Sequence, residues 1–242
     1  MDTKQRIAKA LSRAGVASRR QVEKLVLGGR VSVNGDVIND PATKVALIDK
    51  ILVDGELVAL PQNSRIWRYN KPIGLVTSNS DEKGRATIYD KLPKTLPRTM
   101  SVGRLDLQSE GLLLLTNDGE LKRFLELPTS ELARRYRVRA HGVHNEKLIS
   151  KLRAGIQIDG EKFRPMSVKL DKIQGSNIWY AVALKEGRNR EIRRAFSQIN
   201  LSVNRLIRIS FGPFELGALP KGDVEEVPST VHIEGWGSVA GV

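Results

Sequence analysis

Apolar residues recur at helical spacing in two short segments near the N-terminus. The first, QRIAKALSRAG at residues 5–15, places its apolar residues on one face and stops at Gly15. The second, SRRQVEKLVLGG at residues 18–29, opens at Ser18, which suits an N-cap, and stops at a Gly-Gly pair. Two alternating segments follow, RVSVNGDVI and KILVDGELVAL, and each turns at an Asn-Gly or Asp-Gly pair of the kind that tight hairpins prefer. We therefore expect two helices followed by hairpins in an N-terminal domain over residues 1–60.

The pattern changes at LPQNSR, a polar, proline-containing segment at residues 60–65, and we place a linker at 61–65. Beyond it the periodicity predicts strands at 66–70, 112–116, 135–141, 178–185 and 203–211 and helices at 119–127, 145–153 and 189–199. Strand and helix do not alternate regularly, which argues against a parallel α/β fold. The expected fold class is α+β, with a mixed, largely antiparallel sheet in a second domain over residues 66–228 and a tail at 229–242.

The charge balance indicates a polyanionic partner. The net charge is +13, and the first 30 residues hold eight basic residues against two acidic ones. Nucleic acid is the default partner of such a protein, and a membrane surface comes second. A solvated helix face would also explain the charge run. Because the basic residues gather at one end of a small helical unit that then turns into strands, we favour RNA binding.

Several function classes lack support. The absence of cysteine excludes disulfides and thiolate metal sites, and neither GxxxxGK nor GxGxxG occurs. His141 and His144 in HGVH could be two metal ligands, but no third ligand lies nearby, and a polar turn after a strand explains them better. The N-terminal residues lack a signal-peptide core, and the longest aliphatic run, Leu112 to Leu115, is far too short for a membrane span. We therefore expect a cytoplasmic protein without a membrane partner.

One aspartate is the leading candidate for chemistry. In GRLDLQSEGLLLLTNDG, Asp106 lies between two leucines, one residue after Arg104 and shortly before a run that reads as a buried strand. A carboxylate on a loop held by a rigid core strand is a common catalytic arrangement. A structural turn made by Asp106 and Arg104 is equally consistent with the pattern. A glycosidase pair of Asp106 and Glu110 is weaker, since aromatic residues make up only 5% of the chain.

Two further stretches could serve the same site. LKEGRNREIRRAF, residues 184–196, ends a strand and begins a helix that Asn189 can cap. Its basic residues beyond the first are all arginine, which suits two-pronged contacts with carboxylates and phosphates. In ARRYRVRA, alternation puts Tyr136 on one strand face and arginines on the other. Tyr136 reads either as a core residue or as a platform that stacks on a base.

Together these motifs resemble a known family. ASRRQVEKLVLGGRVSVNG is similar to the S4 RNA-binding domain, and the rest of the chain resembles the pseudouridine synthases that carry such a domain and modify ribosomal RNA. The resemblance rests on five segments in the expected order: YNKPIGLVTS, VGRLDLQSEGLLLLTNDGEL, RRYRVRAHG, LKEGRNREIRR and RLIRISFG. It covers the chain to about Val227. The spelling of EGRNREIRR is closer to the large-subunit than to the small-subunit enzymes of this branch.

The resemblance implies roles for individual residues. Asp106 falls on the family's essential aspartate, Tyr136 on the tyrosine that packs against the target base, and Arg193 on the arginine that pairs with the aspartate. Arg104 would support the site from the neighbouring position. Contacts with RNA would come from Arg19, Arg20, Lys24, Arg30, Arg188 and Arg190.

The implied activity is the isomerisation of a uridine that is flipped out of the RNA into a pocket. Ribosomal RNA would be the partner of a monomeric enzyme that needs no metal and no other cofactor. Whether Asp106 acts as a nucleophile or as a base is left open by the sequence. Two alternatives also stay open: the same chemistry on small-subunit RNA, and a non-catalytic RNA-binding or ribosome-assembly protein.

Overall fold

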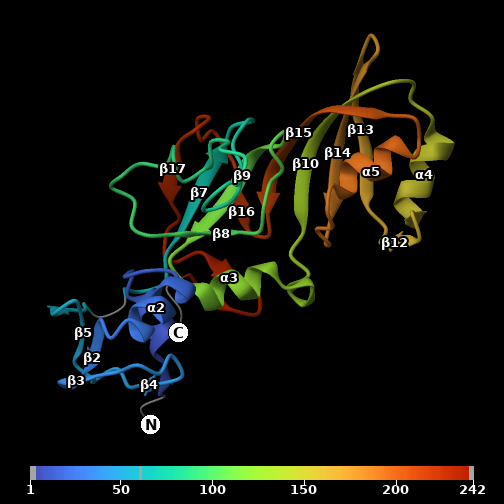
Figure 1. Ribbon diagram of the computed structural model, residues 1–242. Coiled ribbons are helices and arrows are strands. Elements are labelled where there is room, and N and C mark those ends of the chain that lie inside the picture. The colour runs from blue at the N-terminus through green and yellow to red at the C-terminus, as the bar shows by residue number, and fades with distance from the viewer. Residues whose placement is uncertain (1–3, 60–61, 240–242) are drawn as a thin grey trace. The chain divides into compact units, whose positions relative to one another are not determined.

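The computed structural model describes residues 4–59 and 62–239, and the chain divides into two compact units (Figure 1). The first comprises the residues up to Ser64 together with Asn117–Gly119, and the second comprises Arg65–Thr116 and the residues from Glu120 onward. Residues 60 and 61 of the expected linker region and 240–242 of the expected tail lie outside the described residues. Among the helices that the structure describes, none is both long and apolar enough to cross a membrane.

The first unit is built from two helices and short strands. Ser18 caps the second helix in a capping box, because its hydroxyl accepts from the Gln21 N–H while the Gln21 side chain accepts from the Ser18 N–H. Both expected hairpin turns have left-handed residues at their Asn-Gly and Asp-Gly pairs. The strands pair in the order β3-β2-β5-β6, with β1 and β4 paired separately. The elements are β1 (Gln5–Arg6), α1 (Ile7–Arg13), α2 (Arg19–Leu27), β2 (Val31–Val33), β3 (Asp36–Val37), β4 (Lys44–Val45), β5 (Ile51–Val53) and β6 (Glu56–Leu57).

The second unit is organised around one mixed sheet, which confirms the expected α+β class. Its strands run in the order β13-β14-β10-β15-β9-β7-β17, antiparallel except for the pairing of β15 with β9. The principal elements are β7 (Ile66–Lys71), β8 (Met100–Val102), β9 (Glu110–Thr116), α3 (Gly119–Glu126), β10 (Arg134–His141), α4 (Glu146–Ala154), β13 (Ser167–Gln174), β14 (Asn177–Leu184), α5 (Glu191–Ser197), β15 (Ser202–Phe211) and β17 (Val224–Glu226). The shorter ones are a 3-10 turn (Pro128–Ser130), β11 (Ile156–Ile158), β12 (Glu161–Phe163), β16 (Phe214–Glu215), β18 (His232–Ile233) and β19 (Gly237–Ser238).

Each half of the sheet has its own apolar core. In the β13-β14-β10-β15 half, α4 and α5 cover one face and bury residues such as Val138, Tyr180 and Phe196 (Figure 1). In the other half, Leu112 and Leu114 of β9 pack with α3, while the alternate leucines of the same strand pack under the loop that follows β7. The leucine run is therefore a strand buried on both faces.

Two features differ from the sequence expectations, and the structure also describes the tail, whose role the sequence left open. The strand β13 was not expected, because a bulge between Leu170 and Lys172 breaks its alternation. Asn189 does not cap α5; that helix begins at Glu191 after Arg190, which adopts a left-handed conformation and caps with no side-chain bond. The tail packs through Ile233 and Val239, which are buried beside α3.

The two halves of the sheet join where β9 and β15 approach closely at Gly111. This residue has φ +100°, and a Cβ placed on it would lie 2.3 Å from the backbone oxygen of Arg208. The pairing matches Gly111 with Arg208 and Glu110 with Ile207. Because backbone rather than a flexible side chain occupies the space, only glycine fits at this junction.

We expect Gly111→Ala to destabilise the protein by about 2–5 kcal/mol, from a left-handed alanine and the clash with β15. Gly84→Ala is the matched control, since Gly84 has φ +67° and nothing within 4 Å of its would-be Cβ. It should lose only about 1–2 kcal/mol. Urea unfolding of both variants measures the difference, and equal losses would contradict the close approach at the junction.

Candidate active site

A cleft of about 1010 Å³ lies within the second unit. Its walls come from the loop before β9, the start of β10, the segment between β14 and α5, and the middle of β15. Of the expected site residues, the structure brings together Asp106, Arg104, Tyr136, Arg188 and Arg190 along this cleft.

The loop between β8 and β9 holds Asp106 at the cleft. The Asp106 side chain is 30% exposed, whereas the preceding Leu105 is buried. The Thr77 hydroxyl donates to the Leu105 carbonyl at 2.8 Å, and the Ser109 N–H donates to the Asp106 carbonyl at 3.0 Å. The carboxylate thus projects from a backbone that is fixed on both sides.

A buried lysine also holds the loop that carries Asp106. Lys71, at the end of β7, is fully buried, and its ammonium donates to the carbonyls of Pro72 and Ser109 at 3.0 Å and of Asp106 at 3.3 Å. Burial lowers the pKa of Lys71 to about 8, although the carboxylates of Asp106 and Glu110 oppose this effect. The available signal was that Lys71 shares its face of β7 with Trp67 and Tyr69, and the sequence expectations did not include a role for it.

The arginine beside Asp106 is not the one that the resemblance implied. Arg190 Nη1 lies 4.0 Å from the Asp106 carboxylate. Arg193 instead donates to two backbone carbonyls at 2.8 Å, those of Val203 and Gln108. Burial and the nearby Arg190 lower the pKa of Arg193, while Asp106 raises it. The expected ion pair is therefore replaced by two contacts: Arg190 supplies the counter-charge, and Arg193 ties α5 to β15 and to the Asp106 loop.

The other expected partner, Arg104, is exposed in the cleft wall and makes no ion pair with Asp106 in the part of the chain that the structure describes. The structural-turn interpretation of these two residues is therefore not supported. The glycosidase pair is not supported either. Glu110 is held by Arg205 and Lys221 at 2.6 Å in a separate depression that does not include Asp106.

Tyr136 lies in the cleft wall and is 9% exposed. It stands opposite Arg208 of β15 in the sheet register. Arg208 is buried, donates through Nε to the Leu112 carbonyl at 2.6 Å, and keeps Nη2 without a hydrogen-bond partner. A buried guanidinium N–H without a partner is costly unless a ligand completes it. Arg208 is thus a substrate-contact candidate that the sequence expectations did not single out.

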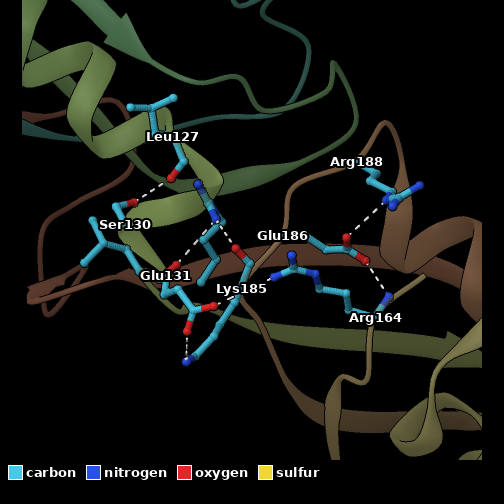
Figure 2. A network of polar contacts seen from close by, with 9 residues as sticks. Leu127, Ser130, Glu131, Arg164, Lys185, Glu186 and Arg188 are labelled. Carbon is cyan, nitrogen blue, oxygen red and sulfur yellow. Dashed lines mark hydrogen bonds and ion pairs between the residues drawn. The ribbon is translucent and has the colours of Figure 1, made fainter. Parts of the chain in front are cut away.

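A polar network braces the rim of the cleft (Figure 2). Glu131 accepts from Lys185 at 2.8 Å, and Arg164 lies 3.9 Å from the same carboxylate. Glu186 accepts from the backbone N–H of Arg164 at 2.6 Å and from Arg188 at 3.1 Å. The network connects the segment before β10 with the segment after β14 and holds Arg188 at the rim.

Glu191, the first residue of α5, is buried in the wall of the cleft. It accepts from the Arg188 N–H at 3.0 Å through one oxygen. Burial raises the pKa of Glu191 to about 7, and the neighbouring Glu186 carboxylate also raises it. Sequence reasoning missed this residue because a glutamate at a helix start normally reads as a solvated, dipole-compensating charge.

In the first unit, Arg19, Arg20 and Lys24 are exposed along α2, as a surface for RNA requires. Arg30 is also exposed, but its guanidinium donates two hydrogen bonds to the Asp54 carboxylate, at 2.7 and 2.6 Å. Arg30 is therefore less available to a phosphate than the sequence suggested.

Comparison with known proteins identifies the family. A model described as RNA pseudouridylate synthase matches residues 65–198, which is more than half of the chain, and an S4 domain model matches residues 5–51. The chain belongs to the RNA pseudouridylate synthase family.

Three relatives and one solved structure align with this chain over almost its full length. An "Uncharacterized RNA pseudouridine synthase" of Rickettsia felis is 47% identical over 94% of this chain and 98% of its own. The "Ribosomal large subunit pseudouridine synthase B" of Haemophilus influenzae is 40% identical over 92% of this chain and 64% of its own, and that of Salmonella typhi is 38% identical over 92% and 79%. A crystal structure of a pseudouridylate synthase aligns with a TM-score of 0.63 at 26% identity and covers 93% of this chain and 96% of that one.

In this RNA pseudouridylate synthase with an S4 domain, the candidate catalytic residues of the cleft lie in the second unit. The cleft combines a partly exposed carboxylate, an aromatic ring and several arginines. This is a suitable set for holding a negatively charged nucleotide with its base against the ring.

The buried ammonium of Lys71 should make stability depend on pH. The folded protein releases this proton near pH 8, whereas an exposed lysine keeps it to about 10.5. The unfolded chain thus binds more protons between these values, so raising the pH through the window favours the folded state. Relative to Lys71→Met, the unfolding free energy of the wild type should rise by on the order of 1 kcal/mol per pH unit. Parallel pH curves from urea unfolding would contradict this assignment.

The three neighbouring arginines of α5 should behave differently. Arg190→Gln should leave stability unchanged and lower the catalytic rate up to about fivefold, since a partly exposed pair at this distance contributes about 0–1 kcal/mol. Arg193→Lys should lower the unfolding free energy by about 1.5–3 kcal/mol, because one ammonium cannot keep both carbonyl contacts. Arg194→Gln, which loses ion pairs with exposed carboxylates and its stacking on Phe163, is the control: it should leave the rate unchanged and lower stability less than Arg193→Lys. Calorimetric melting and single-turnover rates test the three together, and a larger stability loss in Arg190→Gln than in Arg193→Lys would overturn the division.

Proposed function

We propose that this protein isomerises a specific uridine of large-subunit ribosomal RNA to pseudouridine, with Asp106 as the catalytic carboxylate. The observation that carries the proposal is the position of Asp106, a fixed carboxylate in a cleft that also presents Tyr136 and cationic side chains. The choice of large-subunit RNA is supported by the relatives named ribosomal large subunit pseudouridine synthase B. We infer that the protein acts as a monomer in the cytoplasm.

The cleft suits a nucleotide that has left its helix. Its volume of about 1010 Å³ is at the upper end of the usual range for ligand sites, so a nucleotide with part of its backbone can enter. The target atoms of a paired uridine are inaccessible in a duplex, so the base must be flipped. Arg188, Arg190 and Arg104 at the cleft would hold the flanking phosphates, and Tyr136 would stack on the uracil.

Isomerisation breaks the bond between N1 and C1′, turns the uracil, and forms a bond between C5 and C1′. The hydrogen on C5 is then lost as a proton, and N1 gains one, so the overall composition is unchanged. An ionised Asp106 serves this sequence either as the nucleophile that holds the sugar or base, or as the base that removes a proton. Arg190, 4.0 Å from the carboxylate, supplies a nearby positive charge in both versions.

The apolar part of the wall protects the intermediate. Leu105, Ile192 and Leu206 line the cleft next to the polar groups, and all three are buried. Exclusion of water matters here because water would capture an activated sugar and release free uracil. Binding affinity for the rest of the RNA would come from the first unit, through Arg19, Arg20 and Lys24.

Asp106→Asn decides the assignment. The substitution conserves volume and removes the charge, so we expect loss of at least about 10³-fold in rate, a range typical of removed catalytic groups, with unchanged stability and RNA binding. Activity is measured as release of C5 tritium from labelled uridine in ribosomal RNA prepared from cells that lack the protein. Large-subunit and small-subunit RNA are assayed separately, and the product is mapped on the large-subunit RNA.

Asp159→Asn is the matched control. Asp159 lies outside the cleft, is 77% exposed and sits in a left-handed turn that asparagine also accepts. It should retain full activity. Tritium release by Asp106→Asn at the wild-type rate would refute the catalytic role. Release from small-subunit RNA alone would refute the proposed substrate, and a wild-type protein without release from either RNA would leave a non-catalytic binding function.

A further inference from the structure

The face of the sheet opposite the α4 and α5 side carries a second basic surface. Along β10, Tyr136 and Val138 enter the core, whereas Arg135, Arg137 and Arg139 point to the other face. The expected alternation of this strand is confirmed. On that face Arg135 and Arg137 are exposed and Arg139 is half-buried.

Neighbouring strands extend the surface into a shallow trough. The register aligns Lys169 of β13 with Ala181 of β14 and Arg137 of β10, so these three side chains form one row across the same face. The row of Arg135 contains Ala183 and Ser167 in the same way. Two basic rails, one on β10 and one on β13, thus run about 9–10 Å apart, with Ala183, Ala181 and Trp179 of β14 between them. Ala181 is exposed in spite of its position on an inner strand.

The arginines of this face are held in place. Trp179, in the row of Arg139 and Lys172, lies under both Arg137 and Arg139, with guanidinium carbons 4.8 and 5.8 Å from the ring centroid. Arg139 also donates to Asn204 at 2.9 Å. Stacking of this kind leaves the outer N–H groups of a guanidinium available while fixing its plane.

Few carboxylates offset this charge. Asp171 contacts Arg137 at 3.2 Å with both side chains 45% exposed, and the buried Glu110 is already held by Arg205 and Lys221. The basic residues of the face, given in order along the chain, are Arg135, Arg137, Arg139, Lys169, Lys172, Arg205 and Lys221.

We propose that this trough, formed by β10, β14 and β13, is an RNA-binding surface separate from the cleft, and that it takes the sugar–phosphate backbone of an RNA segment that flanks the target. The rails supply charge at both sides, and the alanine floor lets a backbone approach closely. An anionic membrane also attracts cations, but peripheral binding needs apolar side chains that insert; between the rails β14 offers Ala181, Ala183 and Trp179, and Trp179 is buried under Arg137 and Arg139. Non-sequence-specific phosphate contacts of this kind position RNA without reading bases.

The surface rests on the proposed function only in its choice of RNA. A target inside a large folded RNA has long flanking segments, and a cleft of limited volume contacts few of them. The trough would therefore matter for long substrates and not for a short stem-loop that fills the cleft alone.

The test is the triple variant Arg135→Gln/Lys169→Gln/Lys172→Gln, which removes exposed charges without touching the Trp179 stack. With a long large-subunit RNA fragment, the salt dependence of binding, log Kd against log salt, should flatten by about 2–3, at 0.7–0.9 per lost phosphate contact. KM for this fragment should rise at least about tenfold, while kcat at saturation stays at the wild-type value. With a short stem-loop that carries the same uridine, both constants should equal those of the wild type.

The matched control is Lys147→Gln/Lys151→Gln/Lys162→Gln, which removes the same charge from exposed positions on or near α4. It should change the salt slope by less than half as much. Equal slopes in the two triple variants would overturn the proposal, because the effect would then be one of net charge. An unchanged slope in the trough variant would overturn it directly. Sedimentation with anionic phosphatidylserine vesicles that depends on the trough, together with unchanged RNA binding, would assign the surface to membranes instead.

The same experiment separates this inference from the proposed function. Binding and its salt slope are measured without turnover, so they test the trough even if the wild type releases no tritium. Conversely, a wild type that isomerises uridine while the trough variant binds normally would retain the function and reject the surface.

Discussion

The close approach of β9 and β15 at Gly111 is the contact on which the rest of the second unit depends. It is the parallel pairing that joins the two halves of the sheet. The loop that ends in β9 carries Asp106, whereas β15 aligns β10 and therefore Tyr136. A shift of a fraction of an ångström at this junction would change the separation between the carboxylate and the aromatic ring. The glycine is thus a condition for the geometry of the cleft, although its own atoms take no part in the chemistry.

The charged side chains of the cleft fall into two groups: some hold the backbone in place, and others face the substrate. Lys71 is buried and Arg193 is half-buried, and both donate to backbone carbonyls of the Asp106 loop: Lys71 to those of Asp106 and Ser109, and Arg193 to that of Gln108. The Asp106 carboxylate lies close enough to raise the pKa values of both cations, against the lowering effect of burial. Arg190, at 4.0 Å and half-exposed, can move to a phosphate or stay with the carboxylate. A cation bonded to backbone carbonyls is a rigid support, whereas an exposed one is a contact that substrate can displace.

Sequence reasoning found what local physics controls. Helical periodicity, the Ser18 cap and the Asn-Gly turn all depend on residues within a few positions of one another, and the structure confirms them. Alternation on β10 likewise separated Tyr136 from the arginines. The choice between Arg190 and Arg193 depended instead on where a left-handed residue starts α5, because that start rotates the helix relative to the loop. Long-range packing decides such rotations, and neither the composition of the segment nor the resemblance contains them.

The remaining failures have the same origin. Lys71 and Glu191 are buried charges, and a single sequence treats a charge as exposed unless a partner is visible nearby. Besides the adjacent Pro72, the partners of Lys71 are carbonyls more than thirty positions away, and carbonyls carry no side-chain signal. Strand β13 was missed because its bulge changes which side chains share a face. In each case the missing information was a backbone geometry created by distant parts of the chain.

In β10, the alternation of side chains between the two faces of the sheet serves two purposes. The residues of β10 that face α5 must be apolar to build the core. Near the start of the strand this apolar row reaches the cleft at Tyr136. None of the described helices covers the opposite row in the β13-β14-β10-β15 half, so the same backbone can present Arg135, Arg137 and Arg139 without any cost in core packing. Because the strand is rigid and paired on both edges, the two rows keep a fixed offset. A base held against Tyr136 and a backbone held on the arginines would therefore be positioned by one element, so that the distance between them is set by the pleat rather than by a flexible loop.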